Sequence, residues 1–323
     1  MSAADALALD ERSAALLALG RALRDEGYTF TTVTPETHRR VDARAAAAGR
    51  RAARTVREVF GWSRPFEENV LPRAMMDLAR AAGILVEHGG MLRSTIRFSS
   101  LGHELFAHSA YPTTAADSVF FGPDTYRYGE LVAAEMNRSR RRRVVDVGCG
   151  SGAGGILAAR NADAVVLADI NPSALRLSAV NAALASVEDR VEIVESDVLR
   201  SVKGPFDLVI ANPPYMVDPG SRAYRDGGGG FGEALAVRIA RESLARLEPG
   251  GRLVLYTGAA VVEGVDAFLQ AARDVCNEAH AEWHYRELDP DVFGEEIEQN
   301  DAYATVERIA AVALVATTAA GDA

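Results

Sequence analysis

A glycine-rich turn follows a short apolar run near the middle of the chain. The run spans residues 144–147, and Gly148, Gly150 and Gly152 come directly after it. Glycines let the backbone bend sharply and let a ligand approach without meeting a Cβ atom. A helix that begins after such a turn presents free N–H groups at its N-terminus. The pattern therefore predicts a cradle for a nucleotide-type ligand.

The glycines alone leave two kinds of nucleotide site open. Gly150, Gly152 and Gly155 also satisfy the G-x-G-x-x-G pattern of dinucleotide-dependent dehydrogenases. Asp169 ends the next apolar run, seventeen residues after Gly152, and a carboxylate there can accept hydrogen bonds from a ribose diol. Dehydrogenases and other nucleotide-cofactor enzymes both need this carboxylate, so the choice depends on motifs further along the chain.

The tetrapeptide Asn212-Pro213-Pro214-Tyr215 ends a fourth apolar run and suits chemistry on nitrogen rather than hydride transfer. An amide or aryl amine is a poor nucleophile because its lone pair is delocalised, so a site has to hold its N–H bonds while the lone pair turns toward an electrophile. The Asn212 side chain and the Pro213 carbonyl are two acceptors for those bonds, and the prolines restrict the backbone that carries them. Tyr215 offers an aromatic face to a planar acceptor. The alternative is that Asn-Pro-Pro is only a rigid turn.

Together these motifs resemble the class I S-adenosylmethionine-dependent methyltransferases, specifically the amino-methylating group with an Asn-Pro-Pro-Tyr motif. Within this group, the chain is similar to the release-factor glutamine methyltransferases (HemK/PrmC-like) and to the adenine amino methyltransferases of DNA and RNA. The resemblance covers residues 118–317 and includes residues 121–125 and the stretch Asp226-Gly227-Gly228. The chain departs from the release-factor branch in its four consecutive glycines, residues 227–230, and in an N-terminal third that differs from that branch's helical recognition domain.

The resemblance implies S-adenosyl-L-methionine as the cofactor, and no metal. It makes Asp169 the ribose acceptor and Asp197 the contact to adenine. The implied catalytic residues are Asn212, Pro213, Pro214 and Tyr215. The implied cofactor-binding residues are Phe121, Pro123, Thr125, Asp146, Gly148, Cys149, Gly150, Gly152, Asp169, Ile170, Asn171, Ser196, Asp197, Val198 and Asn212.

Apolar runs alternate with helical patterns from about residue 118, which is typical of a parallel sheet with helices on both faces. The predicted strands are 143–147, 164–167, 191–194, 206–211, 252–256, 282–288 and 305–317, with a helix over 262–277. The resemblance implies that residues 116–323 form an α/β, Rossmann-like class I methyltransferase fold with a seven-stranded, mostly parallel sheet.

Residues 1–115 are predicted to form a smaller domain that recognises the substrate, since they carry no cofactor motif. Leucines between Leu9 and Leu23 recur at helical spacing. A helix over 72–84 and strands over 91–98 and 104–110 suggest a helical, winged-helix-like unit. Between residues 36 and 65 the chain holds eight arginines against three acidic residues. This segment is either a solvated helix face or a contact surface for an acidic partner.

Three further features carry alternatives. Arg138 and residues 140–143 form a basic run that is typical of a solvated helix end, with a phosphate contact as the alternative. His280 and His284 have a spacing that occurs in metal sites, but no cysteine pair or carboxylate motif accompanies them. Eight acidic residues between 282 and 301 predict a solvated loop, which would favour a cationic amine if it bordered the acceptor pocket.

Composition limits the class of protein and the kind of partner. The 323 residues carry a formal net charge of −10, which argues against undirected binding to nucleic acid, because that affinity comes from neutralising phosphates. The two cysteines, Cys149 and Cys276, are too few for a disulfide framework or a four-cysteine zinc site. Acidic residues near the N-terminus, and no apolar run of about 18 residues, predict a cytoplasmic protein without a membrane partner. The oligomeric state stays open.

We predict an enzyme that transfers a methyl group to an amino or amide nitrogen by positioning and electrostatics. A protein glutamine is the acceptor that we expect first. The alternatives are an adenine amino group in RNA or DNA and the amine of a small molecule or peptide. A hypothesis of another class is a nucleic-acid-binding module whose methyltransferase fold only senses the cofactor. The intact motif from Asn212 to Tyr215 argues against it, because a sensor would not need that motif.

Overall fold

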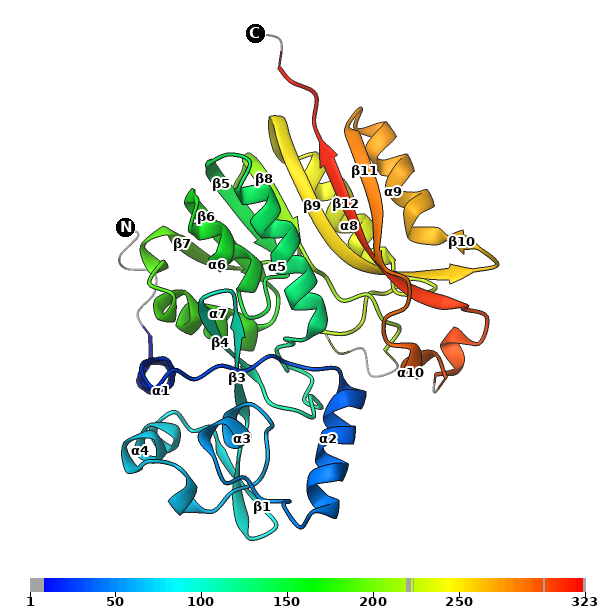
Figure 1. Cartoon of the computed structure of the whole chain (residues 1–323). Coiled ribbons are helices and arrows are strands. Elements are labelled where there is room, and N and C mark those ends of the chain that lie inside the picture. The colour runs from blue at the N-terminus through cyan, green and yellow to red at the C-terminus, as the bar shows by residue number, and fades with distance from the viewer. Residues whose placement is uncertain (1–8, 219–221, 223, 299, 322–323) are drawn as a thin grey trace.

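The computed structural model describes residues 9–218, 222, 224–298 and 300–321. One large sheet with helices on both faces fills the upper part of Figure 1, and the N-terminal helices and hairpins lie below it. Within the described ranges, no helix has both the length and the apolar character that a membrane crossing requires.

The large sheet contains the seven strands that the sequence predicts, and the mixed α/β fold is confirmed. These strands are β5 (Arg141–Val147), β6 (Ala162–Asp169), β7 (Val191–Glu195), β8 (Phe206–Ala211), β9 (Leu247–Val262), β11 (Glu282–Asp289) and β12 (Arg308–Thr317). Their order across the sheet is β7-β6-β5-β8-β9-β12-β11, and the short β10 (Val265–Asp266) pairs with β9. Neighbours from β7 to β9 run parallel, whereas β12 is antiparallel to both β9 and β11.

The direction in which the chain crosses the sheet from strand to strand reverses between β5 and β8. These strands are neighbours although β6 and β7 lie between them in the sequence. Crossovers that leave a parallel sheet in opposite directions open a crevice outside the carboxyl ends of the strands. The glycine turn follows β5 and the Asn212 motif follows β8, so the fold brings both to this crevice.

Helices cover both faces because alternate residues of each strand point to opposite sides. Val144 of β5 lies in one core with Tyr128 and Ile156, which belong to α5 and α6. Its neighbour Val145 lies in the other core with Ile239 of α8. The helices around the sheet are α5 (Pro123–Met136), α6 (Ala153–Ala159), α7 (Pro172–Leu184), α8 (Ala234–Leu244) and α9 (Ala267–Glu278). Shorter helical turns are η3 (Glu188–Arg190), α10 (Gly294–Ile297) and η4 (Asp301–Tyr303).

The N-terminal part consists of short helices and two hairpins. Its helices are α1 (Glu11–Asp25), α2 (Pro35–Ala47), α3 (Val56–Phe60), η2 (Glu68–Val70) and α4 (Arg73–Ala81). Its strands are β1 (Leu85–His88), β2 (Met91–Ser94), β3 (Ile96–Leu101) and β4 (Glu104–Ser109). Asp10 is the N-cap residue of α1. Its side chain accepts a hydrogen bond from the Ser13 N–H at 2.7 Å, which satisfies a free donor of the first turn.

The prediction of one strand over residues 91–98 is wrong. β2 pairs back with β1, and β3 pairs with β4, so the chain changes partner at Thr95. The physical reason is a two-residue turn at Gly89-Gly90, where both residues have positive φ angles, as tight hairpins require. The Thr95 N–H then donates to the Ile84 carbonyl at 2.7 Å.

Helix α7 of the large sheet also belongs to the N-terminal core. Leu177, Val180 and Leu184 pack in one apolar cluster with residues of α1, α4 and the β3–β4 hairpin. The Arg24 guanidinium of α1 also donates to the Leu184 carbonyl at 2.8 Å. The apolar core therefore crosses the boundary predicted between residues 115 and 116.

Candidate active site

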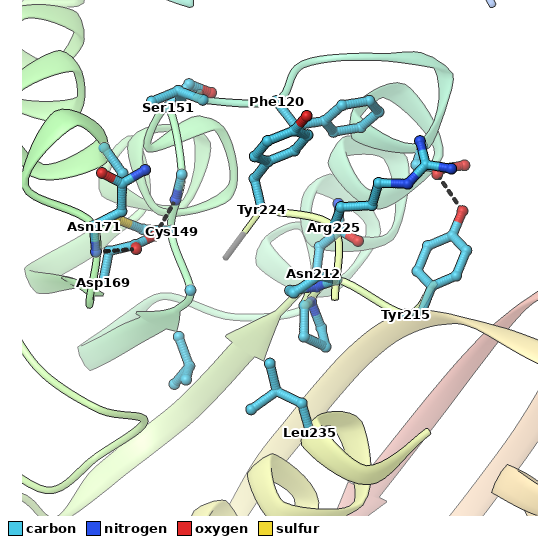
Figure 2. A pocket seen from close by; sticks show the side chains of 18 of the residues that line it. Phe120, Cys149, Ser151, Asp169, Asn171, Asn212, Tyr215, Tyr224, Arg225 and Leu235 are labelled. Carbon is cyan, nitrogen blue, oxygen red and sulfur yellow. Dashed lines mark hydrogen bonds between the residues drawn. The ribbon is translucent and has the colours of Figure 1, made fainter. Parts of the chain in front are cut away.

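A cavity of about 430 Å³ lies at the carboxyl ends of β5 and β8. This volume is within the range of about 300–1,000 Å³ that is common for small-molecule sites. In Figure 2, Cys149 and Asp169 lie on one side, Tyr215 on the other, and Asn212 between them. The N-terminal part contributes Pro35 and Thr113 to the wall.

The glycine turn and the end of β6 form one side of the cavity. Gly148 and Gly150 have φ angles of +69° and +55°, which side chains other than glycine rarely adopt. The Gly150 N–H donates to Asp169 Oδ2 at 2.8 Å, and the Asn171 N–H donates to Asp169 Oδ1 at 2.9 Å. Burial raises the pKa of Asp169. The two loops are thus joined by one carboxylate that lines the cavity.

Most of the predicted cofactor residues line this cavity. They are Thr125, Gly148, Cys149, Gly150, Asp169, Ile170, Asn171, Ser196, Asp197, Val198 and Asn212. Ile170 is 57% exposed and contributes an apolar side chain to the cavity wall.

Four predicted residues lie behind the cavity wall instead. Asp146 is buried and accepts hydrogen bonds from the Tyr128 hydroxyl at 2.8 Å and the Gly155 N–H at 2.7 Å, so it holds the turn from below. Phe121 stacks on His108 in the core, with ring centroids 4.8 Å apart, and its neighbour Phe120 lines the cavity. The others are Pro123, in the first turn of α5, and Gly152, where a Cβ atom would lie 3.0 Å from Ser178 Cβ.

The four residues of the Asn-Pro-Pro-Tyr motif all line the cavity. Within the part of the chain that the structure describes, the Asn212 side chain makes no hydrogen bond. Tyr215 is only 6% exposed, and its ring packs so closely on Gly258 that a Cβ atom there would lie 2.2 Å from the ring. The motif therefore presents a free amide at Asn212 and a fixed ring at Tyr215. Stacking of an acceptor on that ring stays a prediction.

A buried carboxylate holds Tyr215 in place. Asp124, in the first turn of α5, accepts hydrogen bonds from the Tyr215 hydroxyl at 2.5 Å and the Tyr256 hydroxyl at 2.6 Å. Arg127 bonds to Asp124 at 3.2 Å and pairs with Asp289 of β11. Burial raises the pKa of Asp124. This network joins α5, β9 and β11 to the motif.

The glycine stretch after the motif packs directly on the motif's backbone. A Cβ atom at Gly227 would lie 2.8 Å from the Pro214 carbonyl oxygen, and one at Gly232 would lie 2.0 Å from the Tyr215 carbonyl oxygen. Further along the cavity wall, the Tyr224 hydroxyl donates to the Thr113 carbonyl at 2.8 Å. The segment after the motif therefore connects it to the N-terminal part.

Residues 118–279 match the sequence profile of the methyltransferase small domain family. The chain belongs to this family. Release factor glutamine methyltransferase of Deinococcus radiodurans is 36% identical over 155 residues, which cover 44% of this chain and 55% of that protein. The protein of that name from Cereibacter sphaeroides is 38% identical over 187 residues, which cover 53% of this chain and 65% of that protein. The chain thus spans between half and two thirds of the length of these relatives.

Trm5b of Pyrococcus abyssi, a solved structure, has a TM-score of 0.50 and 16% identity, and the match covers 78% of this chain and 69% of that chain. This likeness concerns the fold.

Sequence reasoning missed several residues of the methyltransferase site. Arg238 of α8 donates two hydrogen bonds to Asp197, at 2.7 and 2.9 Å, and these bonds lower the pKa of that carboxyl. Asp124 lies within residues 121–125, which carry part of the family resemblance, but its two tyrosine partners are 91 and 132 residues away in the sequence. No local pattern signals partners at that separation.

The remaining sequence features lie outside the cavity. The basic run extends from the end of α5 into β5, since residues 141–143 belong to that strand rather than to a helix end. Its arginines pair with acidic residues of the methyltransferase domain itself, as Arg140 does with Asp163 at 2.6 Å. The described residues contain no cluster of three His, Cys, Asp or Glu side chains that could hold a metal ion. His280 and His284 therefore do not belong to such a cluster. Among the described residues of the acidic segment 282–301, only Phe293 lines the cavity.

Proposed function

We propose that this methyltransferase uses S-adenosyl-L-methionine to methylate an amino or amide nitrogen, with a protein glutamine as the first acceptor to test. The observation that carries the proposal is the Asn212 amide, which lies in one cavity with the glycine turn and Asp169. The relatives named release factor glutamine methyltransferase support glutamine as the acceptor. An adenine amino group offers the same two N–H bonds and is the alternative.

The residues of the cavity fit the cofactor. A Cβ atom at Gly148 or Gly150 would meet no protein atom within 4 Å, so these positions border open space that a side chain would fill. Asp169 would hold the ribose hydroxyls, and Asp197 would accept from the adenine amino group. When bound, S-adenosyl-L-methionine supplies a methyl group on a positively charged sulfur, which a nitrogen lone pair can attack.

The chain's own part in the reaction is to position the acceptor nitrogen. Asn212 Oδ1 and the Pro213 carbonyl oxygen would accept hydrogen bonds from its two N–H groups. These hydrogen bonds would fix the orientation of the nitrogen so that its lone pair points into the cavity. The hydrogen bond from Tyr215 to Asp124 keeps the motif rigid. We further propose that residues 1–115 recognise the acceptor, a role supported by Pro35 and Thr113 in the cavity wall.

The acceptor is identified by labelling. The protein is incubated with S-adenosylmethionine that carries a labelled methyl group and with extracts that contain proteins and nucleic acids. If protease releases the label and nuclease does not, the acceptor is a protein. Mass spectrometry of the modified peptide then tests for methylglutamine. Label that only nuclease releases would favour adenine, and label in neither fraction would favour a small molecule.

Asn212→Ala tests the role of the motif. Loss of one preorganised polar group of this kind lowers the rate by roughly a hundredfold to a thousandfold. We expect the loss in single-turnover rate rather than in cofactor affinity or thermal stability, because the side chain supports little packing. Asn212→Asp keeps an acceptor oxygen and should retain partial activity, and Asn277→Ala, at an exposed position of α9, is the matched control. Normal turnover by Asn212→Ala would make the motif structural.

A further inference from the structure

Five exposed arginines lie close together in the sequence of the N-terminal part, between residues 44 and 57. They lie in the last turn of α2, in the segment that follows it and in α3, and we call them the arginine face: Arg44, Arg50, Arg51, Arg54 and Arg57. Ala47, Ala48 and Gly49 are the small exposed residues between them. The residues between Arg44 and Arg50 therefore carry no large side chain.

The acidic residues of this segment are already engaged by other cations. Glu36 pairs with Arg39 and Arg40 at 2.7 Å, whereas Asp42 and Glu58 both pair with Arg64, at 3.0 and 2.9 Å. Within the described residues, no arginine of the arginine face forms an ion pair with a carboxylate.

The basic run of Arg138 and residues 140–143, at the start of β5, differs in this respect. Each of its arginines lies within 4.0 Å of a carboxylate of the chain, for example Arg143 and Glu192 at 4.0 Å. The charges of that run are paired within the chain, whereas the described structure gives the arginine face no carboxylate partner. Arg57 contacts an aromatic ring instead, with its guanidinium 5.8 Å from the centroid of Phe30.

The chemistry of the surface selects the class of partner. Protein interfaces depend on buried aromatic or large apolar anchors, but the large apolar residues exposed in the described structure are Val86, Ile170 and Val265, outside this surface. Guanidinium groups match phosphate oxygens with two parallel hydrogen bonds. We infer that the arginine face binds the phosphate backbone of a nucleic acid.

The position of the surface relates it to the cavity. Helix α2 begins at Pro35, which lines the cavity, and runs away from the large sheet toward the arginine face (Figure 1). A helix of 13 residues is about 20 Å long at 1.5 Å per residue. About six phosphates of one strand span that length. Binding at this surface is compatible with a base of the nucleic acid as the methyl acceptor and with a protein carried on the nucleic acid.

The test measures binding of labelled RNA and DNA by the full chain as salt rises from about 50 to 200 mM. A variant with Arg44, Arg50, Arg51 and Arg54 changed to glutamine is compared with a control of equal charge, which changes the exposed Arg73, Arg176, Arg200 and Arg273. We expect the first variant to bind roughly tenfold or more weakly and to lose about 3 from the salt slope of log K. The control should stay within about twofold of the parent protein.

Two further measurements complete the test. Changing the same four arginines to lysine keeps the charge and should restore most of the binding, which separates electrostatic loss from damage to the fold. Poly-glutamate serves as the competitor that represents an acidic protein. Equal binding by the glutamine variant and its control, absence of binding to any nucleic acid, or displacement by poly-glutamate as effective as by RNA would each overturn the inference.

Discussion

At the residue scale, Asp169 joins the two loops that the cofactor would contact. Its carboxylate accepts from the N–H groups of Gly150 and Asn171. Replacing Asp169 with alanine leaves these donors without their partner and removes the acceptor for a ribose. We expect S-adenosylmethionine to bind about 1–3 kcal/mol more weakly by calorimetry. Unchanged affinity in the variant, or tight binding of a nicotinamide dinucleotide by the parent protein, would contradict the assignment.

Asp146 affects stability rather than binding, because it lies behind the cavity wall. Burial raises its pKa to about 6, whereas the pKa of an aspartate in the unfolded chain is about 3.9. The folded state therefore holds a proton more tightly, and the stability from this group is fully present below about pH 4 and is lost as pH rises through about 6. The difference is about 3 kcal/mol at about 1.4 kcal/mol per pKa unit.

Urea unfolding of the parent protein and of Asp146→Asn between pH 4.5 and 7.5 checks this prediction. The parent protein should gain stability relative to the variant as the pH falls, because asparagine keeps the shape and an acceptor for the Gly155 N–H without titrating. A constant difference between the two proteins across this range would show that Asp146 has an ordinary pKa.

At the scale of elements, the segment after the Asn-Pro-Pro-Tyr motif acts as a close-fitting support. A Cβ atom at Gly227 would lie 2.0 Å from the Gly232 carbonyl oxygen and would push on Pro214. Gly227→Ala should displace the motif and lower turnover by about a hundredfold, since errors of about 1 Å have that effect, with cofactor affinity retained. Gly230→Ala is the matched control, because its Cβ atom would lie 4.0 Å from Glu233 Oε1. Equal turnover rates of the two variants would refute the supporting role.

What the sequence predicts at this scale depends on the range of the interactions. The strands and the glycine turn follow from periodicity and turn chemistry within about ten residues, so they are predictable. The hairpin at Gly89-Gly90 was missed because the strands beside it are only four residues each, too short for a clear alternation. The pair of Arg238 with Asp197 spans 41 residues and forms only when α8 packs against the sheet at β9, so no local pattern contains it.

At the scale of the whole molecule, the two parts share one core through α7. Removing residues 1–115 would expose Leu177, Val180 and Leu184, which are at most 2% exposed in the intact chain. Burial of each of these side chains contributes roughly 1.5–3 kcal/mol to the free energy of unfolding. The sum of the three contributions is comparable with the whole stability of a domain, about 5–15 kcal/mol. We expect the shortened protein to aggregate in gel filtration.

A point variant of the intact chain gives a graded measure of the same packing. Leu184→Ala should destabilise the protein by about 2–5 kcal/mol in urea unfolding, the usual effect of such a core truncation. A shortened protein that stays monomeric and binds the cofactor normally would show that residues 116–323 fold independently.

The side chain of Asn181 shows what this shared helix means for building related enzymes. Its Oδ1 accepts from the Ala107 N–H of β4 at 2.7 Å, and its Nδ2 donates to the carbonyls of Ala107 and Ser151, both at 2.9 Å. One amide thus joins an N-terminal hairpin to the glycine turn. A recognition domain from another enzyme could not be exchanged here by cutting the connecting segment alone. The graft would have to include the outer face of α7, so the exchangeable module is larger than the domain boundary in the sequence suggests.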